Sequence, residues 1–116
     1  MSPDPRDVVQ RQLEAYNRRD LDAFLAVFAD DAQLFELGSP LPATAGKAAL
    51  AARFQELFDR SPALHAEVLT RTCLGRAVVD LERVTGRLGS AEPLQLLMIY
   101  EVERGLIVRS HAVRQG

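Results

Sequence analysis

The segment from Asp20 to Glu36, DLDAFLAVFADDAQLFE, constrains the fold of this chain more than any other. Asp20 can cap a helix, and apolar residues follow it at helical spacing. We expect the paired acids Asp30 and Asp31 to end this helix. The segment 32–37 is short, partly apolar and aromatic, which is typical of a strand. The apolar stripe of the predicted helix is Leu21, Phe24, Leu25 and Phe28.

Two further helices are predicted on either side of this segment. Asp4 and Pro5 have the character of an N-cap and a first helical residue, and the helix that they begin should end between Asn17 and Arg19. Turn residues at 38–42 predict a loop, and a third helix is expected at 47–60. Its core face would be formed by Leu50, Phe54, Leu57 and Phe58.

From His65 onward the apolar period changes towards two, which predicts strands at about 65–74, 76–88, 93–104 and 106–114. In the second strand, Val79 and Leu81 suggest that the odd-numbered side approaches the core, so Arg83 and Thr85 would do the same. In the third, the even-numbered side should face the core or a cavity. Three helices followed by a consecutive antiparallel sheet predict an α+β domain.

Length and composition restrict the class of protein. A chain of 116 residues fits one domain, 1–116, and a net charge of −2 without a basic patch argues against nucleic acid as a partner. The lone Cys73 excludes an intrachain disulfide. The N-terminus lacks the features of a signal peptide, and every apolar run is too short to span a membrane. We therefore expect a soluble, cytoplasmic protein with no membrane partner.

The chain resembles the nuclear-transport-factor-2-like superfamily, which includes ketosteroid isomerase and the SnoaL-like polyketide cyclases. The resemblance implies a cone-shaped roll in which a curved, mostly antiparallel sheet wraps around three N-terminal helices and encloses a deep, mostly apolar pocket. This fold supports many reactions, so function must be argued from side chains. The segments that carry the resemblance are Leu13–Asn17, Asp20–Asp22, Phe28–Ala32, Tyr100–Val102 and Gly105–Val108.

Glu36 is the candidate catalytic base, because the resemblance places it where ketosteroid isomerase has its carboxylate base. Glu36 shares a strand face with Leu34, and in apolar space its pKa would rise to suit proton abstraction next to a carbonyl. Two alternatives are an exposed strand end and a pair with an arginine such as Arg83. Pairing would lower the pKa and make Glu36 a poor base.

The rest of the isomerase site is absent from the sequence. The resemblance places Gln12 and Met98 where ketosteroid isomerase has its oxyanion-hole tyrosine and protonated aspartate. Methionine cannot donate a hydrogen bond, so we do not expect efficient steroid isomerisation. Epoxide hydrolysis is also disfavoured, because Arg83 does not share the parity of Asp80 and Glu82 and the last strand has no carboxylate.

Neither histidine has a motif neighbour that assigns it a role, and no acids and histidines have the spacing of metal ligands. His111 lies on the strand face opposite the implied pocket, where members of this family often dimerise. Tyr100 and Tyr16 are the plausible polar groups inside an apolar pocket. No glycine-rich nucleotide motif is present, so no cofactor is expected.

The favoured hypothesis is a homodimeric protein that binds a small apolar ligand with one polar or carbonyl group. If it is an enzyme, we expect proton transfer of the isomerase or cyclase type with Glu36 as base. One alternative is a non-catalytic protein-association module whose pocket is filled by its own side chains. Another is an enzyme that uses His65 or His111. The predicted ligand-binding residues are Gln12, Tyr16, Phe24, Phe28, Phe54, Phe58, Arg83, Leu96, Met98 and Tyr100.

Overall fold

The computed structural model describes residues 3–114 of the chain. Three helices and a six-stranded sheet form an α+β cone, as predicted. The helices are α1 (Pro5–Arg18), α2 (Leu21–Leu25) and α3 (Lys47–Asp59), and a 3-10 turn, η1, spans Arg87–Gly89. The strands are β1 (Phe28–Glu36), β2 (Thr44–Ala45), β3 (His65–Leu74), β4 (Ala77–Thr85), β5 (Leu94–Glu103) and β6 (Leu106–Arg114).

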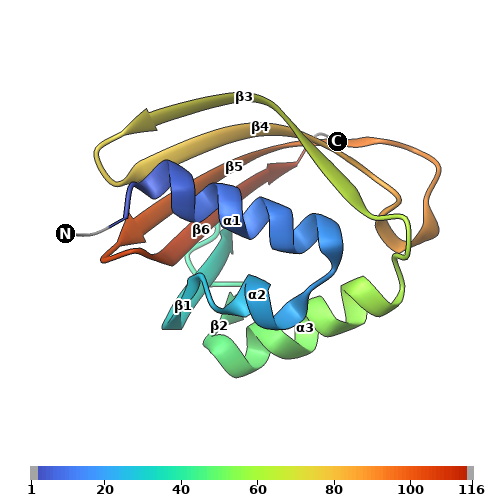
Figure 1. Cartoon of the computed structure of the whole chain (residues 1–116), viewed down its shortest axis with the longest axis horizontal. Coiled ribbons are helices and arrows are strands. Elements are labelled where there is room, and N and C mark those ends of the chain that lie inside the picture. Colours follow the sequence, from blue (N-terminus) through green and yellow to red (C-terminus); the bar gives the residue numbers. More distant parts are fainter. Residues whose placement is uncertain (1–2, 115–116) are drawn as a thin grey trace.

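The sheet has the strand order β2-β1-β6-β5-β4-β3. Among the described residues, only the β1–β6 pair is parallel, and all other neighbouring pairs are antiparallel. The long strands β3 to β6 curve over α1, while α2 and α3 lie on the far side of α1 from β3 (Figure 1). The concave face of the sheet and the helices therefore enclose the interior.

The first helix forms where the sequence predicts it. Asp4 accepts a hydrogen bond from the backbone N–H of Arg6, and Pro5 occupies the first turn. At the other end, Arg19 adopts a left-handed conformation and closes the helix. Val8, Val9, Gln12 and Ala15 are buried against the sheet.

The second helix is shorter than predicted. It ends at Leu25, and Phe28 already pairs with Ile107 as the first residue of β1. The paired acids Asp30 and Asp31 therefore do not end a helix but lie exposed within β1, where the register shifts between Phe28 and Gln33. This irregularity in the strand lets both acids face solvent. The sequence pattern had indicated that the two acids mark the end of a helix.

The parity of β4 is the reverse of the prediction. Val78 pairs with Tyr100 and Glu82 pairs with Leu96, and directly opposed residues lie on the same face of a sheet. Because Leu96 and Tyr100 face the core, the even-numbered residues of β4 do so too. Arg83 is exposed on the outer face, so its expected approach to the pocket is wrong.

Three of the phenylalanines predicted as ligand-binding residues form part of the core instead. Phe24, Phe28 and Phe58 are buried, and the ring of Phe24 lies 5.0 Å from that of Phe28 and 5.8 Å from that of Phe58. The rings of Tyr16 and Phe54 complete this cluster at 6.2 Å and 4.5 Å from Phe24. The ring of Phe24 on α2 thus packs against rings from α1 and α3 and connects the three helices.

No helix within residues 3–114 has the length and apolarity that crossing a membrane requires.

Candidate functional site

A cavity of about 270 Å³ opens between α1, α3 and the concave face of the sheet. Its walls are mostly apolar and come from Leu34 of β1, Phe54 and Leu57 of α3, and the inward side of β5. This volume is close to the lower limit of about 300 Å³ that is usual for small-molecule sites. The even-numbered side of β5, Leu94, Leu96, Met98 and Tyr100, lines the cavity as the sequence pattern predicted.

Three polar residues form what we call the floor of the cavity: Gln12, Glu82 and Tyr100. All three line the cavity and all three are buried; Glu82 is only 6% exposed. The Tyr100 hydroxyl donates a hydrogen bond of 3.5 Å to Oε1 of Gln12, which joins β5 to α1. Within residues 3–114, Glu82 forms no ion pair with a basic side chain.

Burial and a neighbouring charge change the acidity of the floor. Desolvation, followed by the negative charge of Asp80, raises the pKa of Glu82 to about 7. Burial also raises the pKa of Tyr100 well above its ordinary value, and the charge of Glu82 adds to this effect. Tyr16, which lines the same cavity, has its pKa raised to about 12 by desolvation. Glu82 can therefore both accept and release a proton near neutral pH, while the tyrosines stay protonated.

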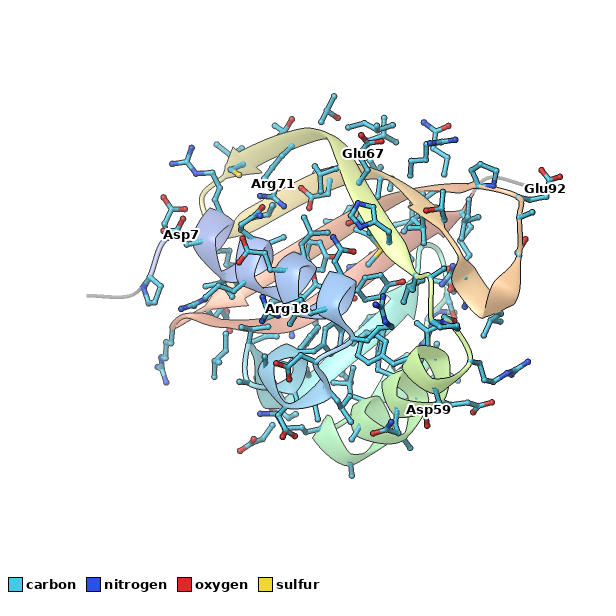
Figure 2. The ribbon with its side chains drawn as sticks, turned by 45° about the vertical axis from the view of Figure 1, so that its right-hand side comes forward. Asp7, Arg18, Asp59, Glu67, Arg71 and Glu92 are labelled. Carbon is cyan, nitrogen blue, oxygen red and sulfur yellow. The ribbon has the colours of Figure 1, made fainter. Side chains whose placement is uncertain are left out.

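Asp80 lies two residues before Glu82 on the same face, but its environment is different. Its side chain is 1% exposed, and Arg71 of β3 donates two hydrogen bonds to its carboxylate, of 2.7 and 2.9 Å. Arg71 also donates a bond of 2.9 Å to Gln10 of α1, so it lies between β3 and α1 (Figure 2). The carboxylate of Asp80 is therefore paired with a cation, whereas that of Glu82 is not.

Six charged residues form what we call the mouth of the cavity: Glu36, Arg53, Glu56, Arg60, Arg87 and Arg114. The Glu36 side chain is 45% exposed and accepts a hydrogen bond of 3.0 Å from Nε of Arg114. The expectation that Glu36 lies desolvated in apolar space is therefore wrong. Of the alternatives considered from the sequence, pairing with an arginine holds, but the partner is Arg114 at the end of β6 and not Arg83.

The structure brings together only some of the predicted ligand-binding residues. Those that line the cavity are Gln12, Tyr16, Phe54, Leu96, Met98 and Tyr100. Arg83 and the core residues Phe24, Phe28 and Phe58 do not line it. Neither histidine does so: His65 is exposed, and His111 stacks on Phe35 with 5.0 Å between ring centroids. Among the described residues, no group of three or more acids, histidines and cysteines could hold a metal ion.

Sequence reasoning missed Glu82 as a site residue, and a signal for it was present. Val78 and Val84 flank Asp80 and Glu82 on the even-numbered side of β4, so both sides of this strand carry apolar residues. The outer side holds Val79 and Leu81, which are only partly buried. Two acids between two valines on one parity can indicate an inward face with an embedded polar site, which is the arrangement observed.

The fold and site define a class of protein, and the comparisons with known proteins agree with it. The model of the SnoaL-like domain family matches residues 9–110. The chain therefore belongs to the SnoaL-like domain family, within the nuclear-transport-factor-2-like superfamily, as its sequence motifs predicted. None of the curated proteins compared matches the chain.

Similar solved structures cover nearly the whole chain. An uncharacterised cystatin-fold protein of Novosphingobium aromaticivorans is 26% identical, with a TM-score of 0.87 and coverage of 98% of this chain and 99% of that one. A "putative polyketide cyclase" of Sinorhizobium meliloti is 24% identical, with a TM-score of 0.77 and coverage of 91% and 93%. A "putative ketosteroid isomerase" of Kribbella flavida is 20% identical, with a TM-score of 0.81 and coverage of 97% and 78%. The last two likenesses show the fold alone.

Proposed function

We propose that the protein binds a small, mostly apolar carbonyl compound in the cavity and that Glu82 exchanges a proton with it. The observation that carries this proposal is a buried carboxyl group, without a basic partner in residues 3–114, that faces a mostly apolar cavity. A general base is most effective when its pKa lies near the working pH, and that of Glu82 is about 7. This chemistry is of the isomerase or cyclase type.

Glu82 suits this role better than Glu36, which was favoured from the sequence. The Glu36 side chain is 45% exposed and already accepts a hydrogen bond from Arg114. Glu82 is buried and forms no ion pair within residues 3–114, and its desolvation outweighs the opposing charge of Arg71, so its carboxyl group is free to exchange a proton near neutral pH. Glu82 also lies beside Gln12, whose amide N–H groups can donate to a bound carbonyl oxygen, and beside Tyr100, whose hydroxyl could donate to that oxygen in exchange for its long bond to Gln12.

Exchange of carbon-bound protons tests the proposal without knowledge of the natural substrate. Aryl alkyl ketones small enough for the cavity, such as butyrophenone, are incubated with the protein in D₂O. Deuterium uptake next to the carbonyl is followed by NMR. We expect protein-dependent exchange that increases as the pH rises through about 7, because only ionised Glu82 accepts a proton.

Two matched variants assign the base. Glu82→Gln keeps the shape of the side chain but should lower the exchange rate by about a hundredfold or more. Glu36→Gln makes the same chemical change at the mouth and should change the rate only a few-fold. The opposite ranking would return the role to Glu36. An absence of both binding and exchange across the ketones would contradict the proposal.

The alternative function, an association module with a filled pocket, is less well supported by the geometry. A cavity of about 270 Å³ with a buried ionisable group is costly to keep in a domain that uses only its outer surface. Homodimerisation is compatible with both functions and stays a prediction. The partly exposed apolar residues on the outer face of the sheet, among them Val79, Leu81, Leu97 and Ile99, would supply such an interface. Sedimentation equilibrium would test it.

A further inference from the structure

The mouth of the cavity carries more positive than negative charge. Four arginines and two glutamates line it, and both glutamates are paired: Glu36 with Arg114 at 3.0 Å and Glu56 with Arg60 at 3.2 Å. Within residues 3–114, neither Arg53 nor Arg87 forms an ion pair with a carboxylate. Two guanidinium groups at the mouth are therefore available to an anion.

Arg53 is held in place without a charged partner. It projects from α3, and its Nη1 donates a hydrogen bond of 2.7 Å to the hydroxyl of Thr44, which is buried in β2. Its guanidinium also lies 5.6 Å from the ring centroid of Phe54, a wall of the cavity. One hydroxyl satisfies a single donor of a group that has five, so the remaining N–H groups can bind a ligand.

Arg53, Arg87 and Arg114 line the same cavity, and their charges act on one another. Desolvation lowers the pKa of Arg53, and the positive charges of Arg114 and Arg87 lower it further, whereas Glu36 acts in the opposite sense. Three cations from α3, η1 and β6 thus repel one another at the edge of an apolar cavity. Binding of an anion between these guanidinium groups would reduce their mutual repulsion.

Arg87 is placed at the mouth by two backbone constraints on its neighbours. Gly86 has a φ of 73°, and a Cβ atom there would lie 2.2 Å from the carbonyl oxygen of Ala63. On the other side, the backbone N–H of Leu88 donates a bond of 2.8 Å to the buried hydroxyl of Ser61. In Figure 1, the β4–β5 connection accordingly lies beside the segment that joins α3 to β3. Arg87 therefore sits on a turn fixed against the end of α3.

We infer that the ligand is an amphipathic carboxylate, whose apolar carbonyl-bearing body occupies the cavity and whose carboxylate binds Arg53 and Arg87 at the mouth. Guanidinium groups match a carboxylate in both charge and geometry. This inference rests on the proposed function and adds the substrate class: oxo acids with an apolar body, in place of neutral ketones.

Matched ligand pairs test the inference. 4-Oxo-4-phenylbutanoate and its primary amide have nearly the same shape, and they differ in charge. Their affinities, with those of two homologous pairs, are measured by isothermal titration calorimetry. We expect the carboxylates to bind about tenfold more tightly than the amides, because each charged contact contributes more than a neutral one. The preference should fall as NaCl concentration rises.

Variants assign the preference to the two arginines. Arg53→Gln and Arg87→Gln should each reduce the carboxylate preference, and in the double variant the acid and the amide of each pair should bind about equally. Arg53→Lys, which keeps the charge, should retain part of the preference. Arg83→Gln is the matched control: it removes the same charge from the outer face of β4 and should change nothing.

The outcomes separate this inference from the proposed function. Equal binding of acids and amides, with Glu82-dependent exchange of both, would overturn the inference and leave the proposed function in place. A carboxylate preference that survives in Arg87→Gln and in the double variant would also overturn it. If no member of any pair binds, the proposed function fails and the inference fails with it.

Discussion

The floor and the mouth of the cavity each contain a glutamate, and the two residues differ in almost every respect except chemical type. Glu82 is 6% exposed, forms no ion pair within residues 3–114 and has its pKa raised to about 7. The Glu36 side chain is 45% exposed and is bound to Arg114. Which of the two glutamates is available for proton transfer depends on how deeply its carboxyl group is buried and on whether a cation binds it. The position of a glutamate in a family motif does not decide this.

Asp80 sharpens this comparison, because it is as deeply buried as Glu82 and lies two residues away. Arg71 compensates its charge with two short hydrogen bonds. Of these two neighbouring buried carboxylates, Asp80 is bound by a cation and Glu82 is not. The charge of Asp80 raises the pKa of Glu82, and the positive charge of Arg71 acts in the opposite sense.

The largest effect is expected from breaking the buried Arg71–Asp80 ion pair and comparing the result with the loss of the Glu36–Arg114 pair at the mouth. Arg71→Met leaves Asp80 buried and unpaired, which should lower the free energy of unfolding by about 3–5 kcal/mol at pH 7. Arg114→Met removes the partner of the exposed Glu36 and should cost only about 0–1 kcal/mol. Urea unfolding of both variants measures the difference. Equal losses would mean that burial does not distinguish the two regions.

A second prediction concerns the pH dependence of stability. Because folding raises the pKa of Glu82, the folded state binds more protons than the unfolded state between the two pKa values, and stability falls as the pH rises. From an unfolded value of about 4.3 to a folded value of about 7, this loss amounts to about 3 kcal/mol.

Glu82→Gln should remove this loss, so the variant should gain stability relative to the parent between pH 5 and pH 8. Chemical denaturation at a series of pH values measures the gain. Glu36→Gln serves as the control and should follow the parent protein over this range. A Glu82→Gln curve parallel to that of the parent would contradict the assignment of the raised pKa.

The smallest of the three effects concerns the backbone that places Arg87. Gly86 and Gly89 both have positive φ angles, of 73° and 76°, but only Gly86 is pressed against another segment. Gly89→Ala should cost about 1 kcal/mol through strain alone. Gly86→Ala should cost about 2 kcal/mol or more, because the turn must also move away from Ala63. Thermal unfolding compares the two, and similar losses would show that the contact with Ala63 does not constrain η1.

The sequence predicted the architecture well because its helices and strands have strong local signals. The cap at Asp4 and Pro5, the apolar face of α3 and the period-two pattern of β5 and β6 all led to elements close to the observed ones. The boundary between α2 and β1 was missed because Phe28 continues the helical stripe in sequence, although its backbone pairs with Ile107. That pairing joins residues far apart in the chain, which no local pattern records.

The site was less predictable, and β4 shows why. Val79 and Leu81 suggested the inward side, but they lie on the outer face of the sheet. The correct parity follows from the pairing of Glu82 with Leu96, and the register of that pair is set across the long connection through Gly86 and Pro93. Turn geometry fixes the register of short hairpins and cannot do so for a connection of this length.

The measurement that tests the account most directly is the titration of the Glu82 side-chain carboxyl by carbon-detected NMR, with Glu82→Gln used to assign its resonance. We expect a pKa of about 7 for Glu82 in the free protein. This pKa should change when 4-oxo-4-phenylbutanoate fills the cavity. A pKa near the ordinary glutamate value of about 4.3 that no carbonyl compound alters would contradict this expectation. Glu82 would then be solvated or paired in solution, and the cavity would lack an available base.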